Sequence, residues 1–225
     1  MKYEVLLLDA DGTLFDFDEA EKYALKNTYR FLSIPYDDFH LKLYKEINEQ
    51  AWKDFEKGKI SLEDLKIGRF KKLFNNQDMD YDQISMMYLN FLGEGNFEIE
   101  GAREVCMALC KKFRLVIVTN GTASVQEKRF KNSSIIQYIE TMVISENTGY
   151  KKPEAAIFDY TLNKIGHKEK SSVLIVGDSL TSDIQGGINA GIDTCWYNSK
   201  GNPNTYQIIP TYEINHLQEL LTLLL

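Results

Sequence analysis

The feature that most constrains the fold is the alternation of two sequence patterns along the chain. Short apolar runs, rich in β-branched residues, predict buried parallel strands over residues 4–8, 115–118, 142–144, 173–176 and 194–196. Helical patterns separate these runs from Gly101 onward and predict helices over residues 102–112, 125–130, 154–165 and 183–190. Strand and helix in this order predict an α/β fold, a doubly wound parallel sheet with helices on both faces.

A long segment between the first two predicted strands exceeds what a crossover connection needs. It contains amphipathic helical patterns over residues 19–32, 36–55, 61–74 and 81–92, and Ser61 with Asp64 resembles a helix start. We therefore predict two domains. Residues 1–14 and 97–225 form the α/β core, and residues 15–96 form an inserted helical-bundle cap.

Composition excludes several classes of protein. The net charge of -7 argues against a surface that binds nucleic acid, although a local phosphate pocket remains compatible with it. No apolar run suits a signal sequence or a membrane span, so we expect a cytoplasmic protein. Cys106, Cys110 and Cys195 are too few for a disulfide framework. The pair Cys106 and Cys110 lacks further metal ligands nearby, so we expect buried thiols there.

Acidic residues follow two of the predicted strands. Asp9 and Asp11 come directly after the first strand, where extended backbone sends residues i and i+2 to the same side. Asp178 ends the strand at 173–176, and Asp183 follows at a helix start, where helix capping and metal support are equally good explanations. An Asp-Gly turn alone would not explain acids at both strand ends. Four converging carboxylates predict a hard divalent cation, Mg²⁺.

Candidate phosphate ligands follow two other strands. Thr119 and Asn120 come after the strand at 115–118, although Asn-Gly by itself also suits a plain turn. Lys152 precedes Pro153, which we place at the first position of the helix beginning near Glu154. A lysine beside the acids would offset the charge of a phosphoryl group.

The ordered motifs Asp9-x-Asp11-Gly-Thr13, Thr119-Asn-Gly, Lys152-Pro and Gly177-Asp178-x₄-Asp183 resemble the haloacid dehalogenase superfamily, and the helical insertion resembles its members with a helical cap. The resemblance implies that Asp9 is the nucleophile, Asp11 the general acid/base and Thr119 a phosphate ligand. It implies that Lys152, rather than Lys151, is the catalytic lysine. It also implies that Mg²⁺ binds Asp9, the Asp11 backbone carbonyl and Asp178, with Asp183 in support.

The expected activity is phosphomonoester hydrolysis through an aspartyl phosphate. The founding dehalogenases of this superfamily use no metal and lack the second aspartate, so Asp11 together with Asp178 favours phosphorus chemistry. A sugar-phosphate or phosphoglycolate phosphatase, a phosphomutase and, in a different class, a phosphoacceptor signalling domain are the alternatives. Residues 186–198 resemble the nucleoside 5′-monophosphate phosphatase branch, so we expect a small phosphorylated metabolite, a nucleotide, as substrate. Tyr23, Trp52 and Phe55 could stack on a base, but core packing or contact between cap and core explains them better. Monomer and homodimer both remain open.

Overall fold

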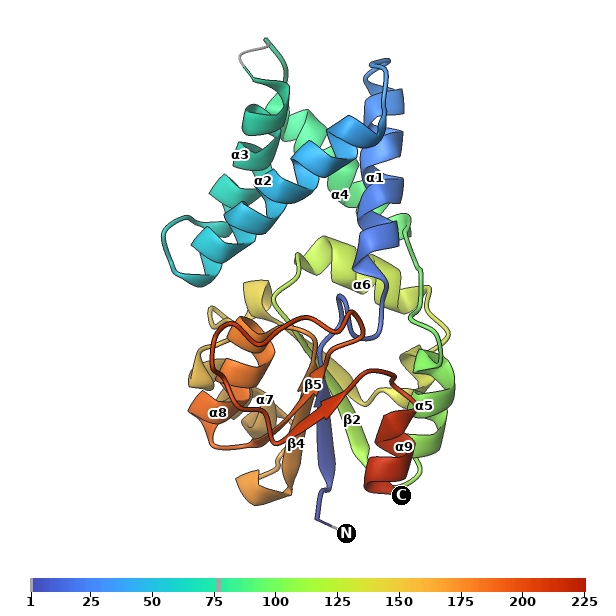
Figure 1. Cartoon of the computed structure of the whole chain (residues 1–225), viewed down its shortest axis with the longest axis vertical. Helices are drawn as coiled ribbons and strands as arrows, with labels where there is room; N and C mark the ends of the chain where they lie inside the picture. Colours follow the sequence, from blue (N-terminus) through green and yellow to red (C-terminus); the bar gives the residue numbers. More distant parts are fainter. Residues whose placement is uncertain (1, 76–77) are drawn as a thin grey trace. The chain divides into compact units, whose positions relative to one another are not determined.

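A computed structural model describes residues 2–75 and 78–225, and the chain divides into two compact units (Figure 1). One unit contains Met1–Phe17 and Asn96–Leu225, and the other contains Asp18–Gly95. The second unit begins later than the cap expected from residue 15. The reason is that Phe15 and Asp16 are bonded to the first unit, where the Asp16 N–H donates to the Phe97 carbonyl at 2.7 Å.

The first unit is built on a parallel sheet, which confirms the predicted fold class. Its strand order among the described residues is β3-β2-β1-β4-β5-β6. The strands are β1 (Val5–Leu8), β2 (Arg114–Thr119), β3 (Thr141–Ile144), β4 (Val173–Gly177), β5 (Asp193–Tyr197) and β6 (Tyr212–Ile214). β6 was not predicted, because this edge strand has only three residues and one of them, Glu213, is exposed.

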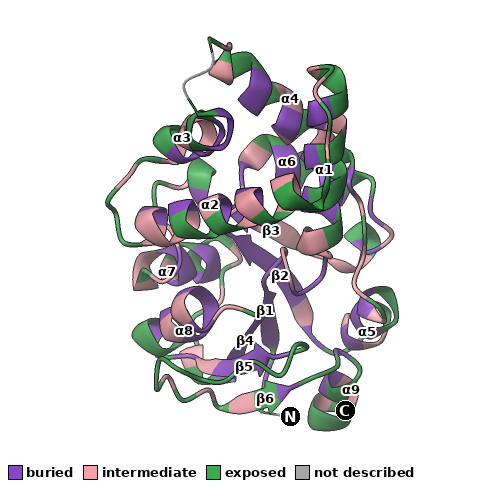
Figure 2. Cartoon of the chain, turned by 45° about the horizontal axis from the view of Figure 1, so that its top comes forward, coloured by how far each residue is buried: buried purple, intermediate pink, exposed green. Residues whose placement is uncertain are grey.

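Helices cover both faces of this sheet (Figure 2). Leu6 and Leu8 of β1 pack with α5 (Ala102–Leu109) and α9 (Glu219–Leu224). Val5 and Leu7 pack on the opposite face, which also carries α7 (Ala155–Lys164) and α8 (Gln185–Ala190). The residues of β1 are buried on both faces, so all four are apolar and each contributes roughly 1.5–3 kcal/mol through burial.

The second unit contains the helices α1 (Phe17–Phe31), whose first residue belongs to the first unit, α2 (Asp38–Glu56), α3 (Leu62–Phe74) and α4 (Tyr81–Glu94). Ser61 and Asp64 form a reciprocal capping box at the start of α3, as their spacing predicted. Trp52 and Phe55 pack edge to face at 5.7 Å in a small core, whereas Tyr23 is 38% exposed. Two of the three aromatics therefore serve packing.

Two expectations from composition can be compared with the described residues. No helix among them combines the length and the apolar character needed to cross a membrane. The thiols of Cys106 and Cys195 are free and buried, and Cys110 is partly buried. Burial raises the pKa of Cys106 to about 12, so its thiol stays protonated and acts as a small apolar side chain.

Candidate active site

The candidate site lies where the strand order reverses. The chain runs outward from β1 through β2 to β3 and then returns to the other side of β1 with β4. Crevices outside the carboxyl ends of strands at such a reversal bind ligands. Asp9 follows β1, and its N–H donates to the Val176 carbonyl at 2.9 Å, so the pairing of β1 with β4 extends to the acid.

Three carboxylates gather at this reversal. One oxygen each from Asp9, Asp178 and Asp183 lies within 4.8 Å of the others. Asp9 and Asp183 are buried, whereas Asp178 is exposed. The backbone of Asp178 is held by β5, because the Trp196 indole N–H donates to its carbonyl at 2.8 Å.

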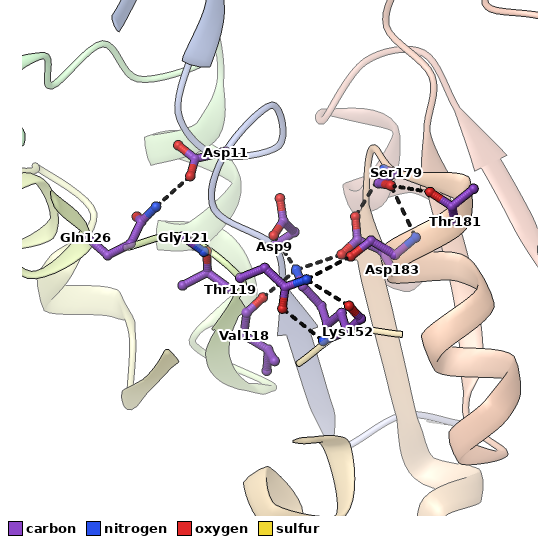
Figure 3. A network of polar contacts seen from close by, with 12 residues as sticks. Asp9, Asp11, Val118, Thr119, Gly121, Gln126, Lys152, Ser179, Thr181 and Asp183 are labelled. Carbon is purple, nitrogen blue, oxygen red and sulfur yellow. Dashed lines mark hydrogen bonds and ion pairs between the residues drawn. The ribbon is translucent and has the colours of Figure 1, made fainter. Parts of the chain in front are cut away.

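Lys152 is the counter-charge of this acidic group. Its side chain is 2% exposed, and its ammonium donates to the Asp9 Oδ1 atom and, at 2.7 Å, to the Val118 carbonyl (Figure 3). The same Nζ lies 2.7 Å from Asp183 Oδ1. The structure thus brings together Asp9, Lys152, Asp178 and Asp183, which the sequence placed at separate strand ends.

The three carboxylates carry more negative charge than the single ammonium of Lys152 can offset. Burial raises the pKa of Asp9 well above its usual range, Lys152 offsets part of this shift, and Asp183 and Asp178 add to it. Loss of hydration beside its buried neighbours and the charge of Asp183 raise the pKa of Asp178 to about 7, although the residue itself is exposed. Burial opposes the charge of Lys152, but Asp183 and Asp9 outweigh this effect and raise its pKa.

A divalent cation fits these residues. Three carboxylates that share one lysine keep an excess of negative charge, and their oxygens are the ligands that Mg²⁺ takes in proteins. Asp9, Asp178 and Asp183 are the side chains that the structure offers for this purpose.

Asp183 does not cap the helical turn that contains it, so the structure does not bear out the capping explanation. It lies in a π-helical turn, Leu180–Ile184, whose N-cap is Ser179 rather than Asp183 itself. Its Oδ2 accepts the backbone N–H of Ser179 at 3.0 Å, while Oδ1 faces Lys152. Asp183 therefore fastens the loop after β4 and the lysine to each other.

The lysine loop depends on Asn120. Both ends of the Asn120 amide bond the backbone of Lys152, Oδ1 accepting its N–H and Nδ2 donating to its carbonyl, each at 2.8 Å. The expected place of Pro153 at the first helical position is wrong. Because Asn120 ties Lys152 into the loop, α7 begins only at Ala155, after the N-cap Glu154. The structure thus gives the Asn120 side chain a scaffolding use.

Thr119 ends β2 and is 1% exposed. Its hydroxyl oxygen accepts the N–H of Gly121 at 3.0 Å (Figure 3), which leaves the hydroxyl proton as a donor for a ligand oxygen.

Asp11 contacts residues that the sequence analysis did not single out. Its carboxylate accepts from Gln126 at 2.5 Å and forms an ion pair with Arg129, both from α6 (Ala123–Lys131). These contacts involve only the carboxylate. The metal role that the resemblance implies for Asp11 belongs to its backbone carbonyl instead. In the sequence, the one indication of this contact is that Gln126 and Arg129 lie three residues apart and so share one face of the helix after β2.

The fold and this acidic strand-end site define a hydrolase class that comparison with known proteins confirms. Residues 3–191 match the family model of haloacid dehalogenase-like hydrolases, and the chain belongs to that family.

Individual relatives cover nearly the whole chain. The HAD-hydrolase YfnB of Bacillus subtilis is 39% identical over 97% of this chain and 94% of its own length. A YfnB crystal structure bound to magnesium matches with a TM-score of 0.94, covering 100% of this chain and 99% of that one. The pyrimidine 5′-nucleotidases PynA of Streptococcus pneumoniae and YjjG of Escherichia coli are 36% and 33% identical. PynA matches 98% of this chain and 94% of its own length, and YjjG matches 100% and 99%.

Proposed function

We propose that this protein is a Mg²⁺-dependent phosphomonoester hydrolase that forms an aspartyl phosphate on Asp9 and acts on nucleoside 5′-monophosphates. The observation that carries the proposal is the grouping of Asp9, Asp178 and Asp183 around the buried ammonium of Lys152. A nucleophilic carboxylate, a lysine and further acids at one strand edge suit the transfer of a phosphoryl group.

In the first step Asp9 attacks phosphorus. Lys152 binds Asp9 Oδ1, so we assign the attack to Oδ2. A bond forms between this oxygen and phosphorus, the bond from phosphorus to the ester oxygen breaks, and Asp11 gives its proton to the leaving oxygen. In the second step Asp11 takes a proton from water as the water attacks the same phosphorus. Inorganic phosphate leaves, and Asp9 is regenerated as a carboxylate.

The remaining residues bind and orient the phosphoryl group. The Lys152 ammonium offsets the negative charge of its oxygens, the Thr119 hydroxyl donates to one of them, and Asn120 holds the lysine loop in place. Asp9, Asp178 and the backbone carbonyl of Asp11 would hold Mg²⁺, with Asp183 in support. When bound, the ion supplies positive charge that lets an anionic nucleophile approach an anionic substrate.

The nucleotide substrate class rests on the relatives. PynA and YjjG carry the name pyrimidine 5′-nucleotidase and align over 98% and 100% of this chain, insertion included. We therefore place pyrimidine nucleoside monophosphates first among the substrates.

A panel of phosphate esters tests this proposal. We expect kcat/KM for UMP, dUMP and dTMP to exceed that for AMP, glucose 6-phosphate and phosphoglycolate. EDTA should abolish turnover, and added Mg²⁺ should restore it. Packing alone discriminates similar groups by only about 1–3 kcal/mol, so we expect a shallow optimum among the bases. A sugar phosphate that exceeds every nucleotide more than about tenfold, which is beyond such packing differences, would overturn the nucleotidase assignment.

A further inference from the structure

Both carboxylate oxygens of Asp11 are engaged by one face of α6. The Gln126 amide donates to Oδ2 at 2.5 Å (Figure 3), and the Arg129 guanidinium pairs with Oδ1. Residues three apart on a helix lie on the same face, so a single helix turn binds both oxygens of the carboxylate.

The two side chains of α6 that bind Asp11 are buried. Arg129 is 0% exposed and Gln126 is 1% exposed, whereas the Asp11 side chain keeps 24% of its surface open. A buried charge is costly unless it is paired, and the carboxylate that pairs with Arg129 belongs to Asp11. Asp11 is therefore fixed from the protein side and open on another side.

The loop that carries Asp11 is held at a second point by the same arginine. The guanidinium carbon of Arg129 lies 5.5 Å from the centre of the Phe15 ring. Backbone hydrogen bonds from Gly12 to Phe15 at 2.8 Å and from Phe15 to Ala10 at 2.9 Å close the loop around Asp11. Arg129 thus contacts both the Asp11 carboxylate and Phe15, a residue that closes the same loop.

The position of Gln126 requires a glycine opposite it. A Cβ atom at Gly121 would lie 2.1 Å from Gln126 Nε2, so the amide occupies space that only glycine leaves open. The Gly121 N–H is itself bonded to Thr119, which connects the amide to the end of β2.

We propose that Arg129 and Gln126 are positioning residues that orient Asp11 for proton transfer to the leaving oxygen. This inference rests on the proposed phosphohydrolase function. Neither residue touches the reacting atoms. Their contribution reaches the reaction through the orientation of Asp11, and misplacing a reacting group by about 1 Å costs on the order of 10²-fold in rate.

Leaving-group dependence tests the inference. We expect Arg129→Met and Gln126→Leu to lower kcat for alkyl phosphates by on the order of 10–10²-fold with little change in KM. The loss should shrink for aryl phosphates, whose leaving groups need little protonation. In an Asp11→Asn background, Arg129→Met should have no further effect, and Arg129→Lys should restore part of the rate in the otherwise wild-type enzyme. Glu127→Gln, at an exposed position on the same helix, is the matched control and should behave as wild type.

Two results would overturn the inference. A loss of equal size for every leaving group, or one that adds fully to that of Asp11→Asn, would assign Arg129 and Gln126 a purely structural role. Gln126→Leu removes no charge, so it keeps the test valid if Arg129→Met fails to fold. Wild-type enzyme without activity on any phosphate ester would instead overturn the proposed function.

Discussion

At the scale of residues, the two aspartates after β1 have different surroundings and therefore different proposed tasks. Asp9 is buried and bonded to Lys152, whereas Asp11 keeps part of its surface open and is bonded to α6. A nucleophile must be held rigidly against its target, while an acid/base must reach the leaving oxygen and then a water molecule.

Asp11→Asn removes the transferable proton and keeps the shape of the side chain. We expect kcat to fall by about 10²–10⁴, the usual contribution of positioned acid–base catalysis. The loss should be smaller for aryl phosphates, and steady-state kinetics across a leaving-group series measures it. A uniform loss would indicate that the substitution damages metal binding instead.

Asp178 and Asp183 should differ in their effect on Mg²⁺. Both Asp183 oxygens already bind protein groups, so we expect Asp183→Asn to weaken activation by about 10–10²-fold, as for a residue that supports a ligand. Asp178→Asn should raise the activating Mg²⁺ concentration further, since we assign it to the metal directly. Titration of activity with Mg²⁺ measures both midpoints, and equal shifts would contradict this division.

At the scale of elements, the loop after β1 needs a glycine at one point. Gly12 has φ +82°, and a Cβ atom there would lie 2.5 Å from Asp178 Oδ2. Gly12→Ala should therefore destabilise the fold by about 1–2 kcal/mol through the left-handed backbone and also weaken Mg²⁺ activation.

Gly166→Ala is the matched control for that substitution. Its φ is +69°, and nothing lies within 4 Å of the Cβ position, so it should show the strain without the metal effect. Urea unfolding and Mg²⁺ titration of both variants separate the two contributions. Equal Mg²⁺ midpoints would contradict a steric role for the space beside Gly12.

In the helical unit, a chain of hydrogen-bonded polar side chains connects three helices. Asn48 of α2 donates to Glu21 of α1 at 2.7 Å and accepts from Arg69 of α3 at 3.0 Å, and all three residues are buried. Burial raises the pKa of Glu21 from its ordinary 4.5 to about 7, with Asp18 in the same direction. The Asn48 hydrogen bond and the charges of Lys45 and Arg69 offset part of the shift.

The raised pKa of Glu21 predicts that the free energy of unfolding depends on pH. Between pH 4.5 and about 7 the folded unit holds a proton that the unfolded chain releases, so stability falls as pH rises through this interval, by at most about 3 kcal/mol. Glu21→Gln keeps the acceptor and removes the titration. Hydrogen exchange of α1, α2 and α3 should show wild type losing protection relative to Glu21→Gln from pH 5 to pH 8. A constant difference would contradict the raised pKa.

At the scale of the whole molecule, the sequence predicted the sheet and most of the acidic site. The central strands are largely apolar and buried, and strand ends converge, so Asp9, Asp178 and Lys152 could be brought together from their places in the chain. The contact between the Asn120 amide and the Lys152 backbone was not predicted, because side-chain direction in a loop depends on contacts that spacing does not encode.

Two other features were out of reach for related reasons. β6 is short and its middle residue is exposed, so it carries no buried-strand pattern. Arg129 resembles any cation in the last turn of a helix, and only the folded chain shows that it meets Asp11. The sequence thus predicts where strands deliver side chains better than it predicts which side chains support them.

A phosphoryl group on Asp9 during turnover would be direct evidence for covalent catalysis. The enzyme is mixed with an aryl phosphate and Mg²⁺, quenched in acid during turnover, digested and analysed by mass spectrometry, with Asp11→Asn included to slow hydrolysis of the intermediate. We expect a phosphorylated peptide containing Asp9, and no label and no turnover in folded Asp9→Asn. Continued turnover by Asp9→Asn near the wild-type rate, or a label on another residue, would contradict it.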